Sequence, residues 1–337
     1  MTAGTRTRRP LRRRLVTVPS AVLLFVVATG LLPLILLGGL VVDIVQWAKR
    51  RRPFPVVRLI LAGWVYLAVE VVGLAVLLVI WLVSGFGTAR NLSLRLTYRL
   101  QAWWAAALWG AISSLFSVRL TVEGDEVVKP GPVIVMMRHA SMADTLLPNA
   151  LITRRHGVHL RYVLKSELLI DPALDIAGNR LINYFVDRRS GDGEAEVRAV
   201  GELTRGLAGD EGVLIYPEGT RFSEDRRERI LRRLSERDAA MAARARRLRH
   251  VLPPRLGGSL AMLQAHTPAD LVFVAHVGLD GLARVKDLWE GDLVGASVEV
   301  GFWRVPASEI PEDAAARVDF LFAQWERVDA WIDARLT

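Results

Sequence analysis

The chain has 337 residues, of which 52% are hydrophobic and 23% are charged. Its mean hydropathy of +0.28 is too apolar for an ordinary soluble domain and too polar for a polytopic transporter, so we expect a soluble domain attached to a membrane segment. The absence of cysteine excludes a disulfide framework, a thiolate nucleophile and a Cys-ligated metal.

The net charge of +9 is concentrated near the N-terminus. Residues 1–58 hold eleven Lys and Arg against the single acid Asp43, whereas residues 59–337 hold 33 basic and 34 acidic residues. Because the excess lies beside long apolar runs, anionic membrane lipids are a simpler partner than nucleic acid, which we do not expect the protein to bind.

Residues 15–89 predict a membrane region with two hydrophobic helices, preceded by a basic flank over residues 1–14. The first apolar run, Leu15 to Val42, would extend about 42 Å as a helix, against roughly 30 Å for a bilayer core. The second, Leu59 to Thr88, is broken only by Glu70, which we expect to face protein or water because an intramembrane carboxylate is costly.

The topology of this region has two readings, in which both runs span or both re-enter. Two spans would leave the basic cluster at residues 49–52 opposite the N-terminus, against the positive-inside tendency. A re-entrant hairpin hinged at Thr29, Gly30 and Pro33 would keep both basic clusters on one side. We favour spanning, and in both readings we expect the cell membrane, with the catalytic domain on the cytoplasmic face.

Residues 90–118 predict a helix that lies at the lipid interface. Three arginines precede three tryptophans there: Arg90, Arg95, Arg99, Trp103, Trp104 and Trp109. Basic residues beside clustered Trp suit the interface. The alternative is a domain helix whose tryptophans lie in the core.

Residues 119–337 predict one α/β domain, because short β-branched runs alternate with helical stretches. The expected strands are 120–123, 133–137, 162–164, 181–186, 213–216, 271–277 and 297–303. The expected helices are about 143–154, 193–208, 224–247, 258–266 and 312–335. The stretch 226–249 carries ten arginines and reads as a solvated helix.

His139 and Asp144 follow the expected strand 133–137 directly. In a continuous helix they would lie about 140° apart, so they meet only if His139 lies in the loop and Asp144 in the first turn. The aspartate would then accept the Nδ1 proton and leave Nε2 as a base. The spacing alone does not separate a catalytic pair from a structural one. Two further histidines, His156 and His159, lack a third ligand nearby, so we expect no metal site.

A second polar segment, Pro217-Glu218-Gly219-Thr220-Arg221, follows the expected strand 213–216. Backbone amides, a hydroxyl and a guanidinium in a tight glycine turn suit a phosphate. The alternative is a capped turn with a surface ion pair between Glu218 and Arg221.

Together these segments resemble the glycerolipid acyltransferases, which use 1-acylglycerol-3-phosphate and related lysophospholipids. The shared pattern is H-x4-D after one strand and P-E-G-T-R after a later one. Residues 165–188 and 250–258 are similar to the middle and proline blocks of the family. The closest branch is the one with lysophosphatidate and lysophosphatidylinositol acyltransferases. A departure is Arg138, where many members have Asn.

The resemblance implies an α/β acyltransferase domain with a central mixed sheet flanked by helices. It implies transfer of a fatty acyl group from acyl-CoA or acyl carrier protein to the free hydroxyl of a lysophospholipid, with no cofactor and no metal. His139 would be the general base and Asp144 would orient it. Seven residues would position the acceptor phosphate or the donor: Glu218, Gly219, Thr220, Arg221, Lys165, Arg188 and Arg255. Ser141 reads as a turn residue, because attack by the lipid hydroxyl needs no serine nucleophile.

Two other functions remain open from the sequence. One is a non-catalytic membrane scaffold, whose basic flank and Arg-rich stretch bind anionic lipids or partners. The other is a lipid hydrolase that uses the same His139 and Asp144 on water. Acyl transfer is the reading that accounts for all four motif blocks together.

Overall fold

The computed structural model describes residues 10–50, 54–186, 193–264, 269–280, 289 and 291–336. Seven strands form one sheet in the order β1-β7-β6-β2-β5-β3-β4. Their bounds are β1 Arg119–Glu123, β2 Val133–Met137, β3 His159–Lys165, β4 Tyr184–Val186, β5 Glu211–Ile215, β6 Asp270–Val277 and β7 Ser297–Val305. All seven expected strands are present.

The sheet is mixed, as the resemblance implied. Strands β6, β2, β5, β3 and β4 run parallel, whereas β7 runs antiparallel to β6 and carries β1 parallel to itself. The carboxyl ends of the parallel strands therefore meet along one edge. In such sheets ligands bind outside that edge.

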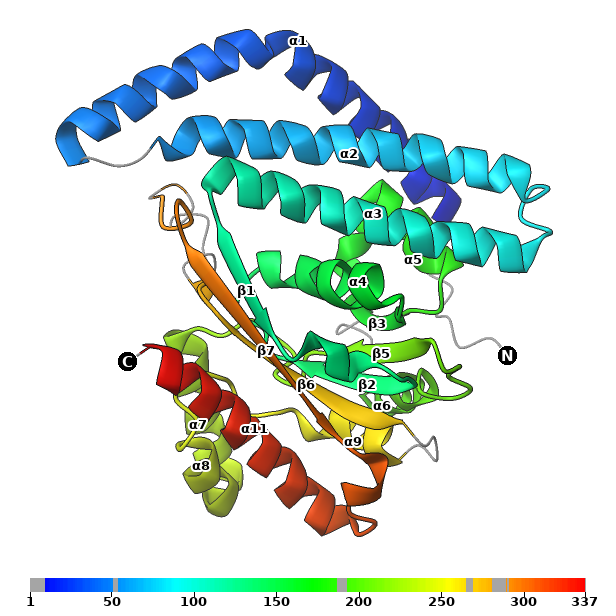
Figure 1. Cartoon of the computed structure of the whole chain (residues 1–337), viewed down its shortest axis with the longest axis vertical. Helices are drawn as coiled ribbons and strands as arrows, with labels where there is room; N and C mark the ends of the chain where they lie inside the picture. Colours follow the sequence, from blue (N-terminus) through cyan, green and yellow to red (C-terminus); the bar gives the residue numbers. More distant parts are fainter. Residues whose placement is uncertain are drawn as a thin grey trace.

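Helices cover both faces of the sheet (Figure 1). They are α3 Arg90–Phe116, α4 Arg154–His156, α5 Pro172–Arg180, α6 Gly193–Glu202, α7 Glu224–Arg237, α8 Ala239–Ala245, α9 Leu256–Gln264 and α11 Ala314–Leu336. The residues of β2 alternate between the two cores: Val133, Val135 and Met137 pack on the α3 side, and Ile134 and Met136 pack on the side of α6, α9 and α11. Burial on both faces accounts for the unbroken apolar run of this strand.

Three expected helices differ in the structure. The helix expected over 193–208 ends at Glu202. The stretch 143–154 is a 3-10 turn, η2 Ala143–Leu146, followed by a π-helix, η3 Pro148–Thr153. The Asp144 side chain accepts from the loop before it, which holds the first turn tight. The Arg-rich stretch divides at Asp238, whose carboxylate caps α8 by accepting from the Met241 amide.

The N-terminal region forms a helical hairpin of α1 Pro10–Arg50 and α2 Pro55–Val83. Asp43 of α1 is fully buried, and its two carboxylate oxygens accept from the Val56 and Val57 amides at 3.0 and 2.9 Å. These amides open α2 and have no partner within the helix, so Asp43 satisfies them. A Cβ on Gly39 would overlap Ile60, which shows how closely the two helices approach.

The hairpin is fastened to the domain at α5. Glu70 of α2 is 2% exposed and accepts from the Ala173 amide at 2.8 Å, so it faces protein as expected. Arg13 and Arg14, at the start of α1, both donate to the buried carboxylate of Asp175. Two arginines of the basic flank therefore form ion pairs within the protein. Contact of the other basic residues of the flank with lipid stays a prediction.

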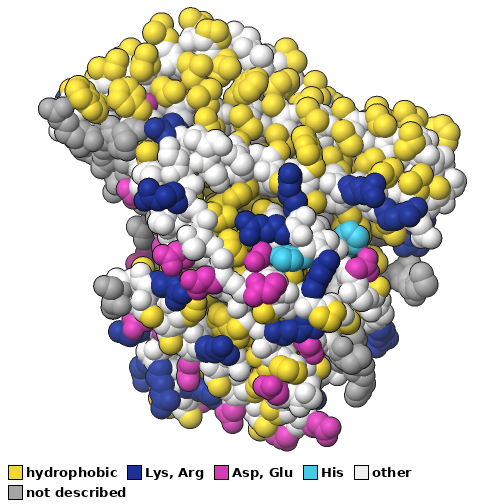
Figure 2. Space-filling view, in the orientation of Figure 1, with side chains coloured by type: hydrophobic (Ala, Val, Ile, Leu, Met, Phe, Trp, Pro, Cys, Tyr) yellow, Lys and Arg dark blue, Asp and Glu magenta, His cyan; other side chains and the backbone are white. Residues whose placement is uncertain are grey.

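Both hairpin helices are long and apolar enough to cross a membrane by length and composition. None of the most apolar window of α1 is buried, against 28% of that of α2. Figure 2 shows hydrophobic side chains over the outer surface of this hairpin, with Lys and Arg gathered below it. Helix α3 lies between α2 and the domain (Figure 1): Trp109 is buried in the core, whereas Trp103 is 40% exposed. Contact of α3 with lipid stays a prediction.

Candidate active site

The predicted site residues gather at the carboxyl edge of the parallel strands. His139 follows β2, Glu218 follows β5, and Lys165 is the last residue of β3. Since β5 lies between β2 and β3, the three segments leave the sheet side by side. The sheet topology thus joins segments that are far apart in the sequence.

His139 and Asp144 form a hydrogen-bonded pair, with 3.1 Å between Nδ1 and Oδ1. His139 lies in the loop and Asp144 in the turn η2, the arrangement that the five-residue spacing required. The Asp144 carboxylate is fully buried, whereas the imidazole is 12% exposed. Because Nδ1 faces Asp144, Nε2 is the ring nitrogen left for use as a base.

The backbone before Asp144 fixes its second oxygen. Oδ2 accepts from the amides of Ala140 and Ser141 at 2.7 Å each. Burial acts to raise the pKa of Asp144, but its hydrogen bonds to the imidazoles of His139 and His276 outweigh burial and hold the pKa well below its ordinary value. The group is therefore an anion that orients His139. Ser141 Oγ accepts from the Asp144 amide at 3.2 Å, so it serves the turn, as expected.

Glu218 joins the second motif to the first. Its carboxylate is 1% exposed and accepts from the amides of His139 at 2.8 Å and Leu252 at 2.9 Å. The Phe222 amide in turn donates to the His139 carbonyl at 2.7 Å. Burial raises the pKa of Glu218 to about 8, although both amides act to lower it. The resemblance assigned Glu218 to the acceptor phosphate. In the structure its carboxylate holds the backbone of two loops, and its contact with phosphate stays a prediction.

Gly219 makes the turn that the motif requires. Its φ is +65°, and its amide donates to the Tyr216 carbonyl at 2.9 Å. A Cβ at this position would lie 2.7 Å from Cδ of Arg255, so the arginine side chain crosses directly over the glycine. The Arg255 amide donates to the Pro217 carbonyl at 2.8 Å, which joins the proline block to this turn.

The other predicted phosphate ligands flank this cluster. Thr220 and Arg221 follow Gly219 and are half-buried, and Lys165 is half-buried at the end of β3. Arg188 lies outside the described residues. Hydrogen bonds and close contacts therefore connect His139, Asp144, Glu218, Gly219 and Arg255, while Thr220, Arg221 and Lys165 lie on the same edge.

Residues 119–273 match the sequence model of the acyltransferase family. This part of the chain, somewhat less than half of its length, is therefore similar to the acyltransferase family. Its fold is similar to the crystal structure of the 1-acyl-sn-glycerophosphate (LPA) acyltransferase PlsC from Thermotoga maritima, with a TM-score of 0.51 over 80% of this chain and 95% of that one. The two chains are 17% identical, so this likeness concerns the fold. No curated protein matches the chain.

The α/β domain holds three residues at this site that the sequence did not single out for this role. Tyr216 places its ring 4.4 Å from that of His139, between centroids. Arg138 is 1% exposed and forms an ion pair with Asp280. His276 of β6 is fully buried beside Asp144. Only one feature of the sequence could have pointed to His276: it is a titratable residue within an expected buried strand.

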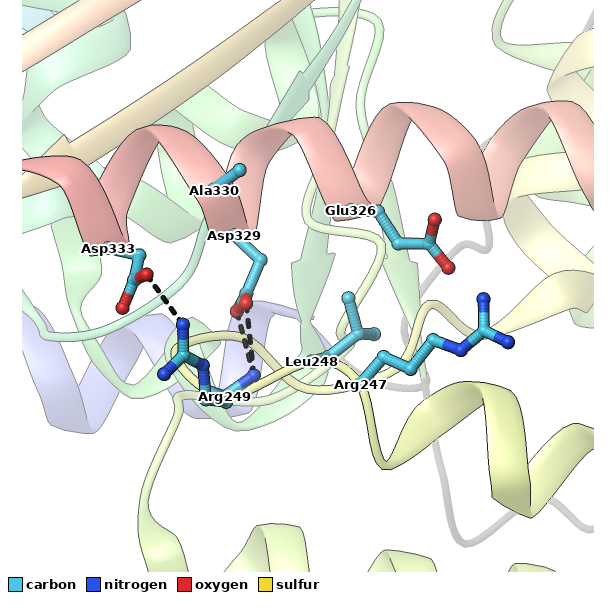
Figure 3. A pocket seen from close by; sticks show the side chains of 7 residues that line it. All are labelled: Arg247, Leu248, Arg249, Glu326, Asp329, Ala330 and Asp333. Atoms are coloured by element: carbon cyan, nitrogen blue, oxygen red, sulfur yellow. Dashed lines mark hydrogen bonds and ion pairs between the residues drawn. The ribbon is translucent and has the colours of Figure 1, made fainter.

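A hollow of about 280 Å³ opens between the segment 247–249 and α11, away from these residues (Figure 3). Its lining is charged: Asp329 accepts from the Arg249 amide, and Asp333 pairs with the Arg249 guanidinium. These charged groups of the lining are therefore already paired with other groups of the protein. Within the described ranges, His, Asp and Glu nowhere form a group of three that could hold a metal ion.

Proposed function

We propose that the protein transfers a fatty acyl group from acyl-CoA or acyl carrier protein to the free hydroxyl of a lysophospholipid such as 1-acylglycerol-3-phosphate. The observation that carries this proposal is the His139–Asp144 pair, whose histidine is held through its backbone by the P-E-G-T-R segment. The match of residues 119–273 to the acyltransferase family supports acyl transfer, and the phosphate-suited turn beside the pair supports a phospholipid acceptor.

In this proposal His139 acts as a general base. Its Nε2 removes the proton from the acceptor hydroxyl as the oxygen attacks the thioester carbonyl, and the new ester forms as the C–S bond breaks. The same proton passes from the imidazolium to the leaving thiolate. Asp144 keeps Nδ1 protonated and stabilises the imidazolium, so no covalent acyl-enzyme is needed.

We assign the acceptor phosphate to the turn beside His139. The Thr220 hydroxyl and the guanidinium groups of Arg221 and Arg255 supply donors of the type that phosphate prefers. Lys165, and Arg188 outside the described residues, are further donors for the phosphate or the acyl carrier. Their contribution is to orient the hydroxyl toward Nε2.

We further propose that the α1–α2 hairpin attaches the enzyme to the cytoplasmic face of the cell membrane. Helix α1 contains Pro19 and Pro33 and is bent, and both of its ends turn toward the domain (Figure 1). The sequence favoured spanning, but this shape supports the re-entrant arrangement instead, because it brings the basic residues at both ends of α1 to the domain side. A membrane-resident acceptor would then meet the site without leaving the lipid.

The test is acyl transfer by purified protein in liposomes, with labelled acyl-CoA or acyl carrier protein and a panel of lysophospholipids. We expect the wild type to convert one acceptor and His139→Ala to lose about 10²- to 10⁴-fold in kcat. His156→Ala is the matched control, since His156 also pairs with an aspartate, Asp125, outside the site. Free fatty acid without new phospholipid would identify a hydrolase. Full activity of both His139→Ala and Asp144→Asn would favour the scaffold.

A further inference from the structure

Asp144 lies between two imidazoles. His139 Nδ1 is hydrogen-bonded to one carboxylate oxygen of Asp144, Oδ1. His276 Nε2 lies 3.6 Å from the other oxygen, Oδ2. His276 is fully buried at the end of β6, beside the last residues of β2. The catalytic carboxylate is thus in contact with a second titratable side chain that the proposed chemistry does not use.

The surroundings of His276 determine which nitrogen carries its proton. Nε2 lies 3.2 Å from the Arg138 carbonyl oxygen and faces Asp144, and both of these groups are acceptors. The opposite nitrogen, Nδ1, is buried and has no hydrogen-bond partner within the described part of the chain. This pattern fits a neutral imidazole with its proton on Nε2. Two carboxylates, Asp144 and Asp280, interact with this ring, and the Arg138 guanidinium donates to the His276 carbonyl oxygen.

Arg138 closes the arrangement from the other side. Its guanidinium donates to the carbonyl oxygen of His276 at 2.7 Å and to that of His250 at 3.0 Å, and it forms a two-pronged ion pair with Asp280. The Arg138 amide also donates to the Val274 carbonyl at 3.0 Å. Residues 138 and 276 therefore hold each other through backbone and side chain, directly before His139.

We propose that His276 is a positioning residue for acyl transfer. Its Nε2–H holds the Arg138 carbonyl and faces Asp144 Oδ2, so the peptide that carries His139 and the carboxylate that orients its ring move as one unit. Loss of this link would let Asp144 turn away from Nδ1 of His139 while leaving the acceptor and donor sites intact. The inference rests on the proposed function, in which His139 is the base.

The kinetic test compares His276→Leu with His276→Gln in liposomes. Leucine removes the donor at similar volume, whereas a glutamine amide can still donate to the Arg138 carbonyl. We expect His276→Leu to lower kcat by about 10- to 100-fold, with KM for both substrates within about 3-fold of wild type, and His276→Gln to recover most of that loss. His156→Leu, which removes an aspartate-paired histidine elsewhere, should change neither parameter. Wild-type kcat in folded His276→Leu, or equal losses in both variants, would overturn the proposal.

A second measurement depends on neither activity nor the folding of the leucine variant. Nitrogen-15 NMR of histidine-labelled wild-type protein in detergent, assigned with His276→Gln, reports the protonated nitrogen of each ring. We expect His276 with its proton on Nε2 and His139 with a hydrogen-bonded proton on Nδ1. A His276 proton on Nδ1 would refute the positioning role. Absence of acyl transfer by wild type would contradict the proposed function instead, so the two failures are distinct.

Discussion

The Glu218 carboxylate accepts a hydrogen bond from the backbone amide of His139 at 2.8 Å. Its other oxygen holds the Leu252 amide, so one buried side chain joins the loops after β2 and β5 to the proline block. A glutamate in a motif that resembles a phosphate site thus holds the backbone of His139, the proposed base. Its loss should affect the protein differently from the loss of a phosphate ligand.

Replacement of Glu218 by alanine should reduce both stability and turnover. The change leaves two amides without their partner in a buried place, which costs about 1–3 kcal/mol each. It also frees the His139 backbone, so we expect kcat to fall by at least about 10-fold. Thermal unfolding in detergent and acyl-transfer kinetics would measure the two effects. A variant with unchanged kcat and a raised KM for the acceptor would show that Glu218 is a phosphate ligand and not a brace.

The raised pKa of Glu218 predicts a pH dependence of stability. Its pKa is about 8 in the folded protein and 4.5 for an ordinary glutamate, so between these values the folded state retains a proton that the unfolded state has released. The free energy of unfolding should therefore fall as pH rises through this window and level off above it. Glu218→Gln has no titratable proton at this position. The difference in the free energy of unfolding between wild type and this variant, measured from pH 4.5 to 9, therefore reports on Glu218 alone. A difference in the free energy of unfolding that stays constant with pH would contradict the prediction.

Gly219→Ala should weaken acceptor binding. The left-handed backbone costs about 1–2 kcal/mol for alanine, and the new Cβ would displace the Arg255 side chain that crosses it. We expect a higher KM for the phosphate acceptor and an unchanged KM for the donor. Gly206→Ala is the matched control, since Gly206 has a φ of +64° but open space around it. Equal effects of the two substitutions on acceptor KM would show that Arg255 plays no part.

Asp175→Asn should loosen the start of α1 from the domain. It removes the charge between Arg13 and Arg14 and leaves a buried amide, at an expected cost of about 1–3 kcal/mol. Burial acts to raise the pKa of Asp175, but the two arginines hold it below its ordinary value, so the same loosening is expected on acidification. Hydrogen exchange of the first turns of α1 would report the change. Glu202→Gln, in an exposed pair with Arg205, should leave exchange there unaltered.

The membrane assignment can be tested with single cysteines, because the chain has none of its own. A polarity-sensitive fluorophore on Leu24→Cys, an exposed position of α1, should shift to shorter wavelength and brighten when anionic vesicles are added. The same label on Arg232→Cys, in exposed α7, should remain in water. Identical spectra at the two positions with vesicles present would contradict insertion of the hairpin.

The sequence predicted the sheet well because its strands are short apolar runs bounded by polar turns. The resemblance implied the pairing of His139 with Asp144, and the five-residue spacing indicated the local geometry that their contact requires. The sequence could not predict His276, because the contact with Asp144 depends on β6 pairing with β2 across more than 130 residues. The roles of Glu218 and Arg138 were hidden for a similar reason, since their partners are backbone groups whose positions exist only in the folded chain.

The attachment of the hairpin at α5 has a mechanical consequence. Arg13 and Arg14 tie the start of α1 to Asp175, Asp43 ties its far part to α2, and Glu70 ties α2 to α5. The hairpin is therefore joined to the domain through both of its helices, and we expect the two parts to move as one body. With the hairpin in the lipid as proposed, its tilt would set the tilt of the His139 ring, and the depth at which an acceptor presents its hydroxyl would become a criterion of substrate choice.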